Sequence, residues 1–145
     1  MLSMKRILCC TDFSPPSLAA FEAGCTLARE GRATVTLLHV VDAPLFVPSG
    51  VMTAPPPPPP EDEKRAAWDK LKAMKPTVPS VKLEYRVELG DIAPAILAVA
   101  KEIAADLIVI GTHGRTGVRR LLMGSVAENI VRNAPCPVLT LKTPS

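Results

Sequence analysis

Five short apolar runs alternate along the chain with segments whose apolar residues recur at helical spacing. Runs of this length are typical of buried strands. The strands are expected at 5–10, 33–41, 81–87, 106–110 and 138–141, and the helices at 15–31, 61–75, 92–104 and 125–133. Because consecutive parallel strands need a crossover connection, this alternation predicts an α/β fold: a mostly parallel sheet with helices on both faces.

The strands differ in how much of their surface they are expected to bury. Val81, Leu83, Tyr85 and Val87 alternate with charged residues, which predicts a strand with one wet face near the sheet edge. The run at 106–110 (DLIVI) is the most hydrophobic, and we expect it to be central. Prolines at the start of the last strand favour an edge position.

Local signals place the helix ends. The first helix should begin after Ser14, because serine is a common N-cap and Pro15 suits the first helical position. Gly31 should end it. Asp91 is the expected N-cap of the helix at 92–104. The apolar face of the first helix is formed by Leu18, Phe21, Cys25 and Ala28.

Composition excludes several classes of protein. A chain of 145 residues with 48% hydrophobic and 21% charged residues is expected to form a single globular domain over 1–145. The net charge of +3 falls short of a nucleic-acid-binding composition. No apolar run approaches the roughly 20 residues of a membrane span, and the N-terminus lacks the apolar core of a cleaved signal. We therefore expect a cytoplasmic protein with neither a membrane nor a nucleic acid as partner.

Two features carry little chemistry by themselves. The cysteines at 9, 10, 25 and 136 show no CxxC or Cys/His metal spacing, and we expect reduced thiols that act as small hydrophobes. Redox chemistry at the adjacent Cys9 and Cys10 is the alternative. Six consecutive prolines at 55–60 predict a proline-rich surface loop at about 43–60, either passive or a docking site for a proline-binding partner.

The most informative segment is GTHGRTGVRRLLMGS, residues 111–125. Its glycines follow the spacing G-x2-G-x9-G, which lets backbone N–H groups approach oxyanions. Ser125 opens a helix whose free N–H groups favour an anion, and His113 and Arg115 add donors and positive charge. The alternative is a flexible loop that ends in a helix cap. Neither GxxxxGK[ST] nor GxGxxG is present, so phosphoryl transfer lacks its usual residues.

Asp12 is the second candidate ligand residue, since it follows the first strand at its carboxyl end. A carboxylate there could accept from ribose hydroxyls or hold a divalent cation; its alternative role is helix capping. If the first and fourth strands are neighbours, Asp12 and the glycine segment face one crevice. His39 lies in an apolar strand and is expected to be a satisfied core histidine. No hydrolytic triad is evident.

These residues resemble the universal stress protein family, in its subgroup with an ATP-binding motif. The resemblance rests on ILCCTDFS at 7–14, LLHVVD at 37–42, GD at 90–91 and DLIVIGTHGRTGVRRLLMGSVAENIVRNAPCPVLTL at 106–141. It implies a five-stranded sheet of order 3-2-1-4-5, the adenine nucleotide alpha hydrolase-like fold. It also implies a homodimer paired through the last strand, Val138 to Leu141.

The resemblance also implies the binding residues. Asp12 and Val40 would contact adenosine, and the phosphates would be wrapped by Gly111, Gly114, Gly124, Ser125 and Val126. The expected function is that of an ATP-binding stress-response switch or adaptor, with Mg²⁺ or Mn²⁺ as a possible companion ion and at most slow ATP hydrolysis. One rival is a nucleotide-free dimeric interaction protein; another is a domain phosphorylated on Asp12.

Overall fold

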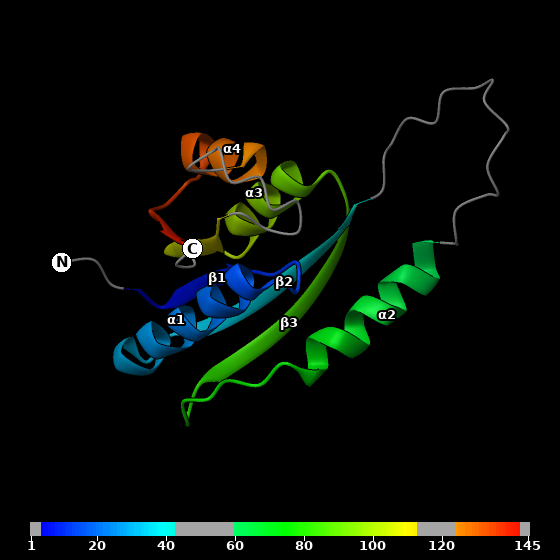
Figure 1. The fold of residues 1–145 in the computed structure, drawn as a ribbon. Helices are drawn as coiled ribbons and strands as arrows, with labels where there is room; N and C mark the ends of the chain where they lie inside the picture. Colours follow the sequence, from blue (N-terminus) through cyan, green and yellow to red (C-terminus); the bar gives the residue numbers. More distant parts are fainter. Residues whose placement is uncertain (1–3, 43–59, 113–123, 143–145) are drawn as a thin grey trace, which may run out of the picture.

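The structure is a computed structural model that describes residues 4–42, 60–112 and 124–142. Strands and helices alternate through these residues (Figure 1). The strands are β1 (Arg6–Cys10), β2 (Thr34–Asp42), β3 (Lys82–Gly90), β4 (Leu107–Gly111) and β5 (Val138–Leu141). The helices are α1 (Pro15–Gly31), α2 (Pro60–Ala73), α3 (Ile92–Glu102) and α4 (Ser125–Asn133).

The strands form one sheet of order β3-β2-β1-β4-β5, and every pairing is parallel. This confirms the α/β fold and the strand order that the family resemblance implied. It also confirms the edge positions of β3 and β5. The expectation that the apolar run at 106–110 lies inside the sheet is also confirmed, because β4 pairs with β1 on one side and with β5 on the other.

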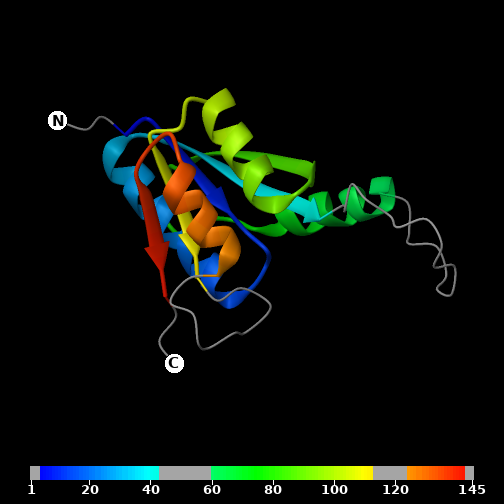
Figure 2. The same cartoon turned by 90° about the horizontal axis from the view of Figure 1, so that it is seen from above.

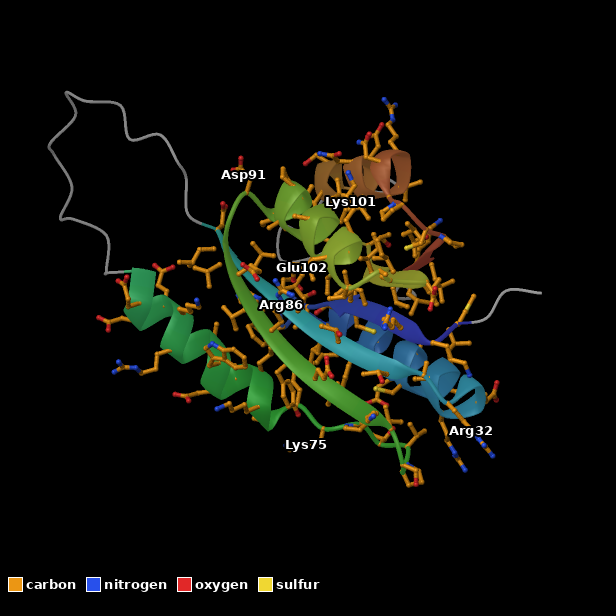
Figure 3. The ribbon with its side chains drawn as sticks, turned by 180° about the vertical axis from the view of Figure 1, so that it is seen from behind. Arg32, Lys75, Arg86, Asp91, Lys101 and Glu102 are labelled. Atoms are coloured by element: carbon orange, nitrogen blue, oxygen red, sulfur yellow. The ribbon has the colours of Figure 1, made fainter. Side chains whose placement is uncertain are left out.

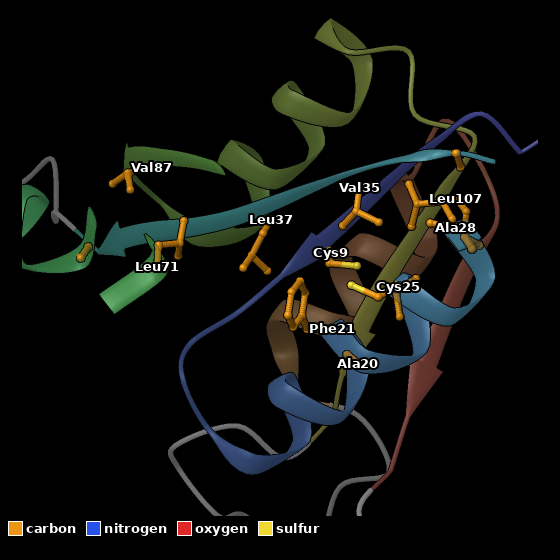
Figure 4. Packing of buried hydrophobic residues seen from close by; sticks show 14 of the residues in the cluster. Cys9, Ala20, Phe21, Cys25, Ala28, Val35, Leu37, Leu71, Val87 and Leu107 are labelled. Carbon is orange, nitrogen blue, oxygen red and sulfur yellow. The ribbon is translucent and has the colours of Figure 1, made fainter. Parts of the chain in front are cut away.

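Helices cover both faces of the sheet, as Figure 2 shows. Successive side chains of a strand point to opposite faces, and the core is accordingly divided in two. Under α1 and α2 lie Ile7, Cys9, Val35, Leu37 and Val109 (Figure 4), and under α3 and α4 lie Leu8, Leu38, Val40, Ile108 and Ile110. Each face therefore has its own apolar cluster.

The wet face of β3 lies at the edge of the sheet. Val87 is buried, whereas Glu84 in the same strand is exposed. Arg86 Nε donates to Glu88 Oε1 at 2.7 Å and its guanidinium also pairs with Glu102 at the end of α3 (Figure 3). A hydrogen bond from Arg86 lowers the pKa of the Glu102 carboxyl. The predicted alternation of apolar and charged residues is confirmed.

The ends of the helices lie close to their expected positions. Ser14 is the N-cap of α1, Pro15 is its first residue and Gly31 its last, as predicted, and the left-handed residue that follows is Arg32, with a φ of 53°. Leu18, expected on the apolar face of α1, is 43% exposed. The last of the six prolines, Pro60, begins α2, because proline is tolerated in a first helical turn.

The rest of the predicted proline-rich loop, residues 43–59, lies outside the described residues. Among the described residues, no helix is both long enough and apolar enough to cross a membrane.

Candidate functional site

A cavity of about 780 Å³ lies at the carboxyl ends of β1, β2 and β4. Crevices in parallel α/β sheets form at this end of the strands. Its apolar lining is supplied by Leu38, Val40, Ile96, Ile110, Val126 and Ile130. Its polar lining includes Thr11, Asp12, Ser14, Ser17, His39 and Thr112. The volume and the mixture of a broad apolar surface with a few polar groups are typical of small-molecule sites.

The structure brings most of the sequence-predicted site residues to this cavity. Because β1 and β4 are neighbours, the segment after β1 and the end of β4 share one crevice. Asp12, Val40, Gly111, Gly124 and Val126 all line it. Ser125 begins α4 but is exposed and is not among the lining residues. The other predicted residues, His113, Gly114 and Arg115, lie outside the described residues.

Asp12 lies just before α1 and lines the cavity. The backbone N–H of Ser14 donates to Asp12 Oδ1 at 3.0 Å, and the Ser14 hydroxyl donates to the same oxygen. The carboxylate is thereby held in the local turn that aspartate favours. Because Ser14 is itself the N-cap of α1, Asp12 orders the turn before the helix rather than capping it, and it remains in the cavity wall.

Behind Asp12 lies a set of hydroxyl groups that sequence reasoning missed. Thr11 Oγ1 and Ser17 Oγ are 2.9 Å apart, and Ser17 Oγ also donates to the Ser14 carbonyl at 2.8 Å. Thr11, Ser14 and Ser17 are each at least nine-tenths buried, and buried hydroxyls need such partners. The signal was available: three hydroxyl residues surround a helix start directly after a buried strand.

His39 joins this wall from β2. It is 9% exposed, and its Nδ1 lies 2.7 Å from the Thr11 carbonyl oxygen. Since a carbonyl can only accept, Nδ1 carries the proton. The ring also packs on Phe13, with centroids 4.6 Å apart. The prediction of a satisfied core histidine is confirmed, and the same residue lines the cavity.

Two glycines border the cavity for different reasons. A Cβ atom at Gly111 would lie 2.5 Å from both the carbonyl carbon and the carbonyl oxygen of Pro16. The backbones of β4 and α1 therefore meet so closely that only glycine fits. A Cβ at Gly124 would meet no described atom within 4 Å, and its φ of −69° suits any residue.

The opening of α4 gives this side of the cavity its positive potential. Gly124 is the N-cap and has no side chain to bond the first amides of the helix. Those amides lack intrahelical acceptors, and the helix dipole adds partial positive charge there. An anion at this end of the cavity would be stabilised.

The opposite end is formed by α2 and by the end of β2. Ala66 and Ala67 of α2 lie between two charged residues of the same helix, Glu63 and Lys70. Asp42 at the end of β2 adds a second carboxylate. The contribution of α2 to the cavity was not predicted from the sequence.

The thiols agree with the expectation of unreactive cysteines. All four are free. Burial raises the pKa of Cys10, which lines the cavity, to about 12, so its thiolate is scarce at neutral pH. Among the described residues, no group of three or more His, Cys, Asp or Glu side chains could hold a metal ion.

Known proteins share this sequence and fold. Universal stress protein MJ0531 of Methanocaldococcus jannaschii is 38% identical over 142 residues, which are 97% of this chain and 83% of that protein. The structure of universal stress protein UspA from Lactobacillus plantarum matches with a TM-score of 0.71 and 25% identity, covering 95% of this chain and 97% of that one.

A second similar structure was solved with a bound ligand. It is a universal stress protein in complex with cAMP, which matches with a TM-score of 0.63 and 26% identity and covers 96% of this chain and 97% of that one. The sequence model of the universal stress protein family matches residues 4–142. Because this match spans nearly the whole chain, the chain belongs to the universal stress protein family.

Proposed function

We propose that this chain binds ATP in the cavity at the carboxyl ends of β1, β2 and β4, and acts in the cytoplasm as a nucleotide-dependent stress-response switch or adaptor. The observation that carries the proposal is the convergence of Asp12, Val40, Gly124 and Val126 on one cavity of about 780 Å³. The relative solved with cAMP supports the choice of an adenine nucleotide.

The chemistry of the cavity walls orients the ligand. The purine lies beside Val40, where apolar side chains from β2, α3 and α4 line the cavity. The ribose hydroxyls donate to Asp12. The phosphates lie at the start of α4, where a Cβ at Gly124 would meet no described atom and the first amides lack intrahelical acceptors. The opposite end is less favourable for phosphates, because the carboxylates of Asp42 and Glu63 there outnumber the ammonium group of Lys70.

A divalent ion would depend mainly on the nucleotide. The described residues form no metal-binding cluster. Of the carboxylates that line the cavity, Asp42 and Glu63 lie at the α2 end, which leaves Asp12 as the candidate carboxylate for an ion held by the phosphates. Mg²⁺ commonly keeps several waters and binds through substrate phosphates with one or two carboxylates. We expect little or no hydrolysis, because the described lining offers no lysine at the α4 end and no pair of metal-holding carboxylates.

Mass analysis and thermal unfolding test the proposal. Protein purified without added nucleotide is denatured, and the released small molecules are identified by mass. Unfolding is then followed with ATP, AMP, cAMP and GTP. ATP at 100 times its Kd should add about 2.7 kcal/mol of stability, which raises Tm by several degrees. No co-purified nucleotide and no shift with any adenine nucleotide would contradict the proposal.

The outer edge of β5 favours a homodimer as a second element of the function. The Pro137 and Leu141 carbonyls accept from Ile108 and Thr112, so Val138 and Thr140 direct their backbone groups away from β4. Such an edge invites another strand. A dimer that signals without nucleotide is the rival function.

Sedimentation analysis separates the two. Wild type should sediment as a dimer, and Thr140→Pro, which removes an outward N–H, should shift the protein toward monomer. A wild-type monomer at all concentrations would contradict strand pairing. An apo dimer that never binds ATP would favour the rival.

A further inference from the structure

Phe13 has a backbone conformation that is costly for its residue type. Its φ is 66°, in the left-handed region that bulky side chains rarely adopt. Such a conformation persists only where surrounding contacts enforce it, and it is common at ligand sites. Phe13 lies between Asp12 and Ser14, so its φ sets the position of the Asp12 carboxylate relative to α1.

Contacts from two other elements hold the Phe13 ring. His39 of β2 packs on it with ring centroids 4.6 Å apart, at an interplanar angle of 37°. Lys70 of α2 places its Nζ 5.4 Å from the ring centroid, within cation–π distance. The backbone N–H of Phe13 donates to Thr11 Oγ1 at 3.0 Å. Phe13 thus connects β1, β2 and α2 at the wall of the cavity.

His39 also contacts the residue that precedes Asp12, because its Nδ1 donates to the Thr11 carbonyl. Its ring packs on Phe13, the residue that follows Asp12. His39 therefore holds the backbone on both sides of Asp12. Lys70 closes the arrangement from α2, and all three side chains line the cavity.

We propose that Phe13 is a positioning residue for the nucleotide: its ring, held by His39 and Lys70, maintains the left-handed backbone that sets Asp12 against the ligand. The proposal rests on the proposed ATP site. It makes α2 part of that site, because Lys70 contributes through Phe13. It also connects nucleotide binding to a helix whose buried side chains, among those described, are Ala67 and Leu71.

A matched pair of lysines tests the contribution of α2. Lys70 lies 5.4 Å from the Phe13 ring centroid and Lys72 lies 5.5 Å from that of Trp68, both from α2, but Lys72 and Trp68 do not line the cavity. Lys70→Met and Lys72→Met remove the same charge and a similar contact. They differ in whether the ring that loses its cation belongs to the site.

The first measurement needs no ligand. Exchange of the Ser14 amide hydrogen, which bonds Asp12 Oδ1, is followed by NMR in wild type and variants. Phe13→Leu keeps the apolar bulk but loses the ring, and its Ser14 amide should exchange about fivefold faster, as expected for a lost aromatic pair. Lys70→Met should give about threefold. Phe13→Tyr should restore protection, and Lys72→Met should match wild type.

The second measurement is ATP titration of the same proteins. Phe13→Leu and Lys70→Met should weaken ATP binding by factors similar to their exchange effects, with Phe13→Tyr and Lys72→Met near wild type. The proposal is overturned if Ser14 exchange is unchanged in Phe13→Leu, or if exchange rises while ATP affinity stays the same. A wild-type chain that binds no ATP removes the proposed function, and the exchange data still decide whether Phe13 holds Asp12.

Discussion

Gly111 and Gly124 belong to one glycine-rich segment, yet the structure gives them unlike surroundings. At Gly111 the missing Cβ makes room for the backbone of α1, because such an atom would lie 2.5 Å from two atoms of Pro16. At Gly124, which lines the cavity, a Cβ would meet no described atom within 4 Å. Glycine at 111 is explained by packing. Among the described residues, neither packing nor backbone angle explains glycine at 124, and the proposed phosphate position offers a reason that can be tested.

The largest effect is expected at Gly111. In Gly111→Ala the new methyl group meets backbone atoms that have no rotamer to change, so relief requires β4 and α1 to separate. We expect a loss of about 3 kcal/mol or more, a fall in Tm of roughly 10 °C, measured by thermal unfolding. Gly124→Ala is the control and should lose at most about 1 kcal/mol, because alanine meets no described atom there but is a poorer N-cap than glycine. Equal Tm values for the two variants would remove the distinction.

The reverse pattern is expected at Gly124. Gly124→Val should lose at most about 1 kcal/mol of stability, because valine is a poorer N-cap than glycine but accepts these backbone angles and meets no described atom. Its side chain would occupy the space assigned to phosphate, so ATP affinity should fall at least about tenfold, or 1.4 kcal/mol. Competition with a fluorescent ATP analogue measures this. Unchanged affinity would mean that phosphates do not lie at Gly124.

Asp12 sharpens the comparison, because it combines a packing role and a ligand role in one side chain. Asp12→Ala removes the acceptor of the two Ser14 hydrogen bonds and should cost about 1–2 kcal/mol in urea unfolding. Asp12→Asn keeps an acceptor oxygen and should recover most of that stability. If Asp12 binds ribose, Asp12→Asn should still weaken ATP binding. An ATP affinity equal to that of wild type would mean that Asp12 serves only the local turn before α1.

The smallest change in stability is expected for Cys10, which lines the cavity. Its folded-state pKa is about 12, above the value of about 8.5 for an unfolded thiol. The folded protein therefore holds this proton more tightly, and the resulting stability is complete below about pH 8 and declines as the pH rises toward 12.

Urea unfolding of wild type and Cys10→Val at pH 7.5 and 9.5 measures this decline. Because Cys10 is partly exposed, wild type should lose about 1 kcal/mol or less relative to the variant between these values. A constant difference would mean that the thiol titrates normally in the folded chain.

Sequence periodicity predicted the framework well because strand and helix patterns report burial directly. It placed β3 and β5 at the edges from their charges and prolines. It also placed β4 inside the sheet from its apolar run. Leu18 was assigned wrongly to the buried face, because helical spacing identifies an apolar stripe but not its width, and Leu18 is 43% exposed.

The candidate site was predictable from local chemistry at Asp12, which follows β1, and at Gly124, which precedes α4, whereas Val40 came from the family resemblance. Two features were not accessible. No local signal marks Phe13 as left-handed, because contacts with β2 and α2 impose that conformation. Nor does spacing reveal that Gly111 serves helix packing, since the atoms it accommodates belong to Pro16, far away in the chain. The roles of His113, Gly114 and Arg115 stay predictions.

A crystal structure of the protein grown with saturating ATP tests the central claim most directly. The account predicts a nucleotide in the cavity with its purine beside Val40, its ribose at Asp12 and its phosphates at the first amides of α4. A cavity without nucleotide under these conditions would contradict it. So would a nucleotide in the opposite orientation, with its phosphates toward Asp42 and Glu63.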